Sequence, residues 1–330
     1  MKVHRDIDHL PPFRNAVITI GTFDGVHEGH RKIIEHLKQE AEKINGETVI
    51  ITFHPHPRKV VSSAILGIRL INTLDEKIEL LEKTGVDHLA IVPFTEVFAN
   101  QQAEEYIRNF LIEKFHPHTI IIGYDHRFGR DRQGDYRLLE KMATTYKYVL
   151  KEIPKHMLDE IAISSTNIRE AIIHGDIDTA NKLLGYDFFF EGLVVDGDKL
   201  GRKLGYPTAN LKIIDEEKIH LGDGIYAVYA ELQTEKGKWQ MANGKRQTTN
   251  SPLATDHSPF KGMMSIGFRP TVDAKKRVVE VNIFDFDEEI YGKTIRVYVK
   301  KYLRPEIKFN NLDELVKQIG LDKIESLKWL

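Results

Sequence analysis

The hydrophobic pattern of the chain changes once, near residues 185–190, and this change constrains the fold more than any other feature. Before it, short apolar runs such as 16–21 alternate with stretches of helical spacing such as 29–44. β-Branched runs that alternate with helices are typical of a parallel sheet covered on both faces. After it, short alternating segments with many glycines indicate an antiparallel barrel or sandwich. We therefore expect an α/β domain over residues 1–186 and a β domain with a terminal helix over residues 187–330.

Length and composition agree with this division. The chain has 330 residues, enough for about two domains. Its 47 Lys and Arg oppose 49 Asp and Glu, which argues against a protein held mainly by nucleic-acid phosphates. It contains no cysteine, which excludes a thiol nucleophile and cysteine metal sites. No signal peptide or membrane-spanning run is visible, so we expect a cytoplasmic protein without nucleic-acid or membrane partners. Oligomeric state is left open.

Three local patterns give further expectations. Asn167 is a suitable N-cap for a short helix ending near His174, with Glu170 in the position of a capping box. The polar stretch 240–260 is expected to be a long loop. A final amphipathic helix is expected to pack on the barrel through one stripe, formed by Leu312, Leu315, Val316 and Ile319.

The most informative segment runs from Gly21 to His30 (GTFDGVHEGH), leaving a strand and opening a helix. At a helix start, unpaired backbone N–H groups and the positive end of the dipole favour anions. Glycines at 21, 25 and 29 allow close approach of a ligand to the backbone. His27 and His30 are three residues apart and could both stabilise a phosphoryl transition state. The alternative is a tight turn with solvent-exposed histidines.

Two other segments support a nucleotide site in the first domain. Ser164 to Arg169 (SSTNIR) places hydroxyl groups at a predicted helix start, with the arginine one turn further on, which would suit a triphosphate. Gly123 to Gly129 (GYDHRFG) follows a predicted strand, at the carboxyl edge where open α/β sheets bind ligands. Each segment alone has a structural explanation, but together they predict one cleft.

The second domain has its own dense motif from Gly197 to Asn210 (GDKLGRKLGYPTAN). Its glycines allow a loop to fold over phosphates, with Arg202 or Lys203 available for charge. Thr208 and Asn210 are two residues apart, so their oxygens point the same way on an extended segment and would suit Mg²⁺. A simple turn into a strand is the alternative.

A glutamate lies on a later predicted strand of this domain. Glu280 and Asn282 share one face of the segment RVVEVNIF, and the valines and isoleucine share the other. By default such a glutamate faces solvent, so the pattern alone gives Glu280 no function.

The motifs together resemble the bacterial bifunctional riboflavin kinase/FMN adenylyltransferase (FAD synthetase) family, over residues 14–310. The first half shares GTFDGVHxGH, TFxPxP at 52–57, GxDxRFG and SSTxIR; the second shares PTAN, IGxRPT at 266–271 and ExxxxDF at 280–286. The resemblance implies a Rossmann-like nucleotidyltransferase domain followed by a riboflavin kinase β-barrel. It implies that riboflavin and ATP give FMN, and that FMN and ATP give FAD and pyrophosphate, both with Mg²⁺.

The resemblance also assigns roles to residues. Those implied to act in catalysis are His27, His30, Arg169 and, as the base for the ribityl hydroxyl, Glu280. Those implied to bind nucleotide are Gly21, Phe23, Asp24, Gly29, Asp125, Arg127, Ser164, Ser165, Thr166, Gly197, Gly201, Arg202 and Pro207. Those implied to lie near the flavin are Phe53, Pro55, Phe94, Phe98 and Arg304. The implied metal ligands are Thr208 and Asn210.

The chain departs from the family pattern at Gln101–Gln102, at His126 in place of an aromatic residue, at Ser265 in place of asparagine, and in the long 240–260 loop. Another nucleotidyltransferase with the H-x-G-H motif, acting on pantetheine phosphate or a pyridine mononucleotide, is one alternative. A flavin-binding regulator without turnover is a second.

Overall fold

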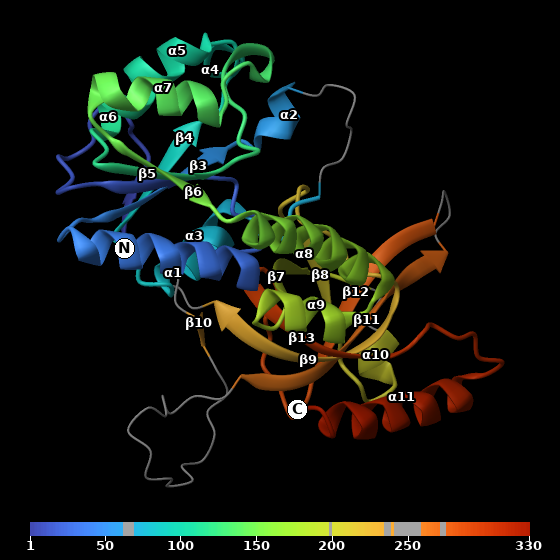
Figure 1. The fold of residues 1–330 in the computed structure, drawn as a ribbon. Helices are drawn as coiled ribbons and strands as arrows, with labels where there is room; N and C mark the ends of the chain where they lie inside the picture. Colours follow the sequence, from blue (N-terminus) through green and yellow to red (C-terminus); the bar gives the residue numbers. More distant parts are fainter. Residues whose placement is uncertain (62–68, 198–199, 234–238, 241–258, 271–274) are drawn as a thin grey trace, which may run out of the picture. The chain divides into compact units, whose positions relative to one another are not determined.

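The computed structural model describes residues 1–61, 69–197, 200–233, 239–240, 259–270 and 275–330. It divides the chain into two compact units, Met1–Thr166 and Asn167–Leu330 (Figure 1). The expected boundary between residues 186 and 187 falls later in the chain and stays a prediction. Residues 241–258 of the expected long loop lie outside the described residues.

A six-stranded parallel sheet forms the centre of the first unit, in the order β1-β4-β3-β2-β5-β6. Its strands are β1 (Lys2–His4), β2 (Val17–Ile20), β3 (Thr48–His54), β4 (His88–Pro93), β5 (Thr119–Gly123) and β6 (Val149–Ile153). Every residue of β2 and β5 is buried, as the near-continuous β-branched runs predict. The predicted parallel sheet is confirmed.

Helices cover both faces of this sheet (Figure 1). The first unit contains α1 (Glu28–Lys43), α2 (Pro57–Val61), α3 (Leu74–Glu82), α4 (Glu96–Ala99), α5 (Ala103–Glu105), a π-helical segment (Tyr106–Ile112), α6 (Glu113–Phe115), a 3₁₀ turn (Arg130–Arg132) and α7 (Tyr136–Tyr146). Helix α1 buries Ile33, Ile34, Leu37 and Ala41, the stripe that its spacing predicts. Burying each of the larger side chains stabilises the fold by about 1.5–3 kcal/mol.

Helix α8 (Lys155–His174) corrects one expectation, because Asn167 does not begin a helix. The helix starts twelve residues earlier, and Asn167 lies within it. Its first half packs closely on two glycines of the first unit: a Cβ at Gly29 would lie 2.7 Å from Ile161, and one at Gly123 would lie 2.5 Å from Leu158. These apolar contacts outweigh the local capping signal. Helix α9 (Ile177–Leu184) follows.

A closed antiparallel barrel forms the second unit. Its strands are β7 (Phe189–Val195), β8 (Ala209–Ile213), β9 (Gly224–Gln233), β11 (Phe260–Pro270), β12 (Lys275–Ile283) and β13 (Thr294–Arg304), with β10 (Trp239–Gln240) paired on the edge of β9. The order β9-β11-β12-β8-β7-β13 closes because β13 also pairs with β9. The predicted barrel is confirmed, and the short helix α10 (Leu200–Lys203) lies between β7 and β8.

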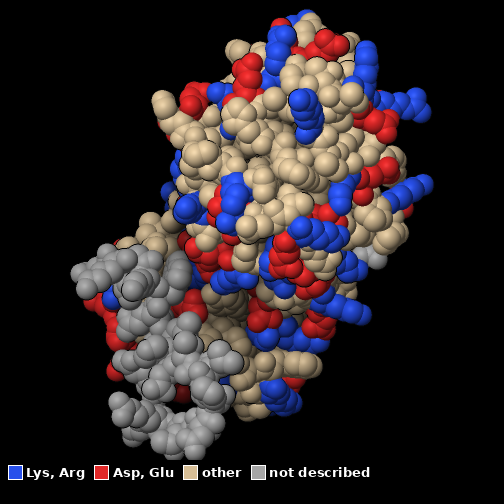
Figure 2. All heavy atoms as spheres, turned by 60° about the vertical axis from the view of Figure 1, so that its left-hand side comes forward, with Lys and Arg blue, Asp and Glu red and all other residues tan. Residues whose placement is uncertain are grey.

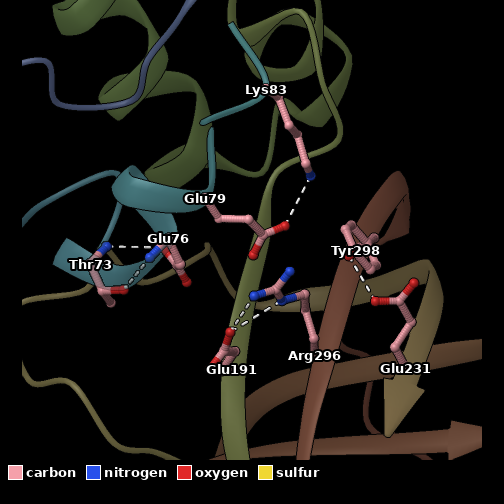
Figure 3. A network of polar contacts seen from close by, with 8 residues as sticks. All are labelled: Thr73, Glu76, Glu79, Lys83, Glu191, Glu231, Arg296 and Tyr298. Atoms are coloured by element: carbon pink, nitrogen blue, oxygen red, sulfur yellow. Dashed lines mark hydrogen bonds and ion pairs between the residues drawn. The ribbon is translucent and has the colours of Figure 1, made fainter. Parts of the chain in front are cut away.

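Polar contacts tie β13 to both of its neighbours (Figure 3). On one side, Arg296 is 4% exposed and donates to Glu191 of β7, with an Nη2–Oε1 distance of 2.6 Å. On the other, the hydroxyl of Tyr298 donates to Glu231 of β9 at 2.8 Å. These contacts satisfy polar groups at the strand that closes the barrel.

The C-terminal helix α11 (Leu312–Leu327) exists as predicted and packs on β9, β11 and β13 of the barrel, but its expected stripe is covered only in part. Leu315, Val316 and Ile319 are half-buried. Leu312 is 56% exposed, whereas the buried residues of α11 are Asp322 and Ser326. Asp322 accepts hydrogen bonds from Arg304 of β13, with distances of 2.8 Å from Nε and 2.5 Å from Nη2. This bidentate ion pair turns the face of α11 that carries Asp322 toward β13. A search for hydrophobic stripes does not find such a polar contact.

Candidate functional site

The turn between β2 and α1 has an unusual backbone. Phe23 and Val26 have φ angles of 48° and 37°, in the left-handed region, and Gly25 has a φ of 89°. Such a conformation costs about 1–3 kcal/mol for each non-glycine residue and persists only where its surroundings fix it. Several contacts outside the turn must therefore hold it.

The two motif histidines lie at the end of this turn and in the first turn of α1. His27 is fully buried and His30 is 8% exposed, and their rings stack with centroids 3.9 Å apart. The ring of Phe23 lies 5.1 Å from that of His30. The alternative of solvent-exposed histidines is therefore wrong.

The serine-rich motif meets the first histidine. Nε2 of His27 lies 2.8 Å from Oγ of Ser165, although 138 positions separate the two residues. Ser164, Ser165 and Arg169 are partly exposed on α8 and Thr166 is exposed. We expected them at a helix start, but they lie within α8. Their backbone N–H groups are therefore used in hydrogen bonds of the helix, and only their side chains can bind a ligand.

The carboxylate of Asp24 is held by the backbone of residues 71–72, just before α3. It is 3% exposed and accepts hydrogen bonds from the backbone N–H groups of Ile71, at 2.9 Å, and Asn72, at 3.2 Å. Lys77 of α3 donates to the carbonyl of Thr22 at 2.7 Å and is 5% exposed. The sequence reasoning missed Lys77, because a lysine on an amphipathic helix normally belongs to its solvated face.

The segment after β5 places Asp125 and Arg127 on the surface and turns the ring of His126 inward. The centroid of this ring lies 5.8 Å from that of Phe128. Burial lowers the pKa of His126 to about 4, so the imidazole is neutral at pH 7.

The lowered pKa of His126 predicts that the protein loses stability in mild acid. The unfolded chain binds a proton near pH 6.5, whereas folded His126 resists it until about pH 4, so stability falls as the pH drops between these values. The pKa values of His4 and His88 are lowered in the same direction, mainly by burial. For His126 the effect is at most about 3 kcal/mol. Melting temperatures from pH 7.5 to 4.5 should show a smaller decline in His126→Phe; an equal decline would contradict the prediction.

Aromatic residues gather at the carboxyl ends of β3 and β4. The ring of Phe53 lies 5.3 Å from that of Phe94 and 5.8 Å from that of Phe98. All three are partly exposed, and Pro55, which follows Phe53 by two residues, is exposed. The structure thus brings together the three aromatic residues for which the resemblance implies a place near the flavin.

In the barrel, strand register brings Glu280 and Asn210 together. They are directly paired on antiparallel strands β12 and β8, and Ser265 of β11 is paired with Glu280 from the other side. Directly opposite residues of neighbouring strands have Cβ atoms about 4.5–5.5 Å apart on one face of the sheet. Carboxylate, amide and hydroxyl oxygens therefore form one row across three strands.

The glycine-containing loop packs on the same residues. A Cβ at Gly197 would lie 2.0 Å from Nδ2 of Asn210, and one at Gly201 would lie 3.2 Å from Oγ1 of Thr208. Only glycine allows this approach. The predicted coupling between the loop and the PTAN segment is therefore present in the structure.

Three further residues of this unit were predicted to bind nucleotide or flavin, namely Arg202, Pro207 and Arg304. Arg202 and Pro207 are exposed. The carbonyl of Pro207 accepts a hydrogen bond from Nδ2 of Asn282 at 2.6 Å, a contact that the sequence reasoning missed. Asn282 is 6% exposed and so anchors the start of the PTAN segment. Arg304 is bound to Asp322, and its expected place near the flavin stays a prediction.

Positive and negative side chains are interspersed on the face of the molecule in Figure 2. Within the described part of the chain, no helix is long and apolar enough to cross a membrane. The same residues contain no group of three or more His, Asp or Glu side chains arranged to hold a metal ion.

Comparison with known proteins covers both units. A family model for FAD synthetase matches residues 11–167, and one for riboflavin kinase matches residues 184–330. The chain is 29% identical to a macrolide-efflux protein from Streptococcus pneumoniae whose crystal structure has a TM-score of 0.79, covering 100% of this chain and 99% of the other.

Full-length relatives carry both names. The bifunctional riboflavin kinase/FMN adenylyltransferase of Buchnera aphidicola is 35% identical, covering 99% of this chain and 98% of that protein. Those of Escherichia coli and Bacillus subtilis are 33% and 34% identical, covering 98% and 95% of this chain and 96% and 92% of theirs. The chain therefore belongs to the bifunctional riboflavin kinase/FMN adenylyltransferase family, and its two units match the two steps from riboflavin to FAD.

Proposed function

We propose that the turn 21–30 and helix α8 carry adenylyl transfer, and that the row Ser265–Glu280–Asn210 with the glycine loop carries the kinase reaction. The observation that supports this division most strongly is the register that sets Glu280 directly opposite Asn210, because it gives the second unit a reactive group of its own. The first unit has the stacked histidines joined to Ser165.

In adenylyl transfer, an oxygen of the FMN phosphate attacks the α-phosphorus of ATP, the bond to the bridging oxygen breaks and pyrophosphate leaves. Negative charge develops on phosphate oxygens during this step. His27, His30 and the hydroxyl of Ser165 lie within one group and stabilise that charge as hydrogen-bond donors. Arg169, four residues beyond Ser165 and so on the same helix face, adds positive charge. The aromatic group Phe53, Phe94 and Phe98 contacts the flavin ring.

In the kinase reaction, the ribityl 5′-hydroxyl of riboflavin attacks the γ-phosphorus of ATP and ADP leaves. Glu280 accepts the hydroxyl proton as the new P–O bond forms. Its side chain is partly exposed, so a substrate can reach it.

The donor set of the barrel fits Mg²⁺. The hydroxyl of Thr208 and the side-chain oxygen of Asn210 are hard ligands, and Glu280 lies beside Asn210. Mg²⁺ usually keeps several waters and takes further oxygens from nucleotide phosphates, so it needs few protein ligands. When bound, the ion neutralises charge on the transferred phosphoryl group. We also propose that the protein is cytoplasmic.

Incubation of the protein with riboflavin, ATP and MgCl₂ should produce FMN and then FAD, separated by chromatography. Chelation of Mg²⁺ with EDTA should stop both products, and added Mg²⁺ in excess should restore them. Binding of FMN without turnover of labelled ATP would support the regulator instead. Transfer of AMP to pantetheine phosphate or a pyridine mononucleotide, but not to FMN, would support the other nucleotidyltransferase.

A further inference from the structure

Lys77 is a buried lysine that contacts the turn 21–30 through its ammonium group. It lies on α3, whose start is fixed by a capping box between Thr73 and Glu76 (Figure 3). Its ammonium group donates to the carbonyl of Thr22, which also accepts a weaker hydrogen bond of 3.3 Å from the hydroxyl of Thr52. The position of this lysine is therefore determined at both ends, by the helix and by the turn.

Burial of the charged Lys77 side chain is energetically unfavourable, because the ammonium group loses its hydration. Burial lowers its pKa, and the negative charge of the nearby Asp24 opposes this effect. A lysine is seldom buried unless its charge is paired. A methionine would fill a similar volume without this cost, so the ammonium group needs an explanation other than packing.

The turn needs a fixed partner for a physical reason. Thr22 directly precedes Phe23, the first of two non-glycine residues in the left-handed region, and His27 follows three positions after Asp24. Asp24 is held from one side by the backbone of residues 71–72, and Thr22 is held by Lys77 from the helix that begins just after them. The same segment of the chain therefore holds the residues on either side of Phe23, the first strained residue of the turn.

We propose that Lys77 is a positioning residue for adenylyl transfer: through the carbonyl of Thr22 it keeps the turn 21–27 in the conformation that binds ATP. This inference rests on the proposed role of the turn. A loosened turn populates the binding conformation only in part, and the apparent affinity for ATP falls by that fraction. Saturating ATP restores the conformation, so the turnover number changes little.

The test compares Lys77→Met with Lys83→Met in the full chain. Lys83 is the C-cap residue of the same helix, but it pairs with Glu79 at the surface, where its side chain is 66% exposed. We expect the KM for ATP in adenylyl transfer to rise about tenfold in Lys77→Met, the effect of one charge-assisted hydrogen bond, with kcat within about twofold. Lys83→Met should match the unaltered protein, and FMN formation should be unchanged in both.

Two results would overturn the proposal. One is an unchanged KM for ATP; the other is a fall in kcat that parallels a loss of folded protein, with KM constant. If Lys77→Met is too unstable to assay, Thr52→Val removes the second donor to the same carbonyl without altering charge, and its KM for ATP should rise about two- to threefold. An unchanged KM in that variant would also count against the proposal. The His27→Ala variant tests the role of the turn separately from that of Lys77. If it does not slow adenylyl transfer, the proposed role of the turn itself is wrong.

Discussion

The His27→Ala variant is expected to form FMN from riboflavin at the normal rate and to form FAD at least about 100-fold more slowly, because one preorganised donor to a developing oxyanion contributes about that much. His27 is fully buried against His30 and Ser165, so its donor needs little reorganisation when charge develops. The His27→Ala/His30→Ala variant should lose more, about 1,000-fold or greater.

The measurement follows both products in one reaction, so the kinase serves as an internal standard for the amount of folded barrel. His36→Ala is the matched control, since His36 lies on the same helix, nine residues beyond His27. It should form FMN and FAD normally. Equal losses of both products in His27→Ala, with the protein still folded, would show that the two reactions do not have separate sites.

Much of the fold is visible in the sequence because it depends on local patterns. The β-branched runs that become β2 and β5 predict buried strands, and the stripe Ile33–Ala41 predicts the buried face of α1. The start of α8 is not predictable in this way. The polar motif around Asn167 has a strong local capping signal, and the packing of Ile161 on Gly29, which overrides it, becomes apparent only when the sheet is assembled.

In the candidate sites, too, local motifs can be predicted from the sequence, whereas contacts that depend on tertiary structure cannot. The turn 21–30 is a local motif, so its histidines and their nearness to one another follow from spacing. The pairing of Glu280 with Asn210 depends on the register of two strands 70 positions apart in sequence, which spacing alone does not give. Lys77 could not be found at all from the sequence, since a buried lysine and a surface lysine look alike on an amphipathic helix.

The Glu280→Gln variant tests that register and is expected to show the opposite loss. FMN formation should fall by about 100- to 10,000-fold, the usual contribution of a general base, while FAD formation from supplied FMN continues. Glutamine retains the size of the side chain and an oxygen on the row with Asn210, so the strand pairing and the barrel should be preserved. What it loses is the capacity to accept a proton from the ribityl hydroxyl.

Two measurements separate catalysis from binding. Quenching of riboflavin fluorescence should show that Glu280→Gln still binds riboflavin, with a Kd within a few-fold of that of the unaltered protein. Glu288→Gln, at an exposed position beyond the same strand, should form FMN normally. If Glu280→Gln bound riboflavin and phosphorylated it at the normal rate, another group would have to accept the proton. Ser265 and Asn210 cannot do so at neutral pH, because a neutral hydroxyl and an amide are too weakly basic.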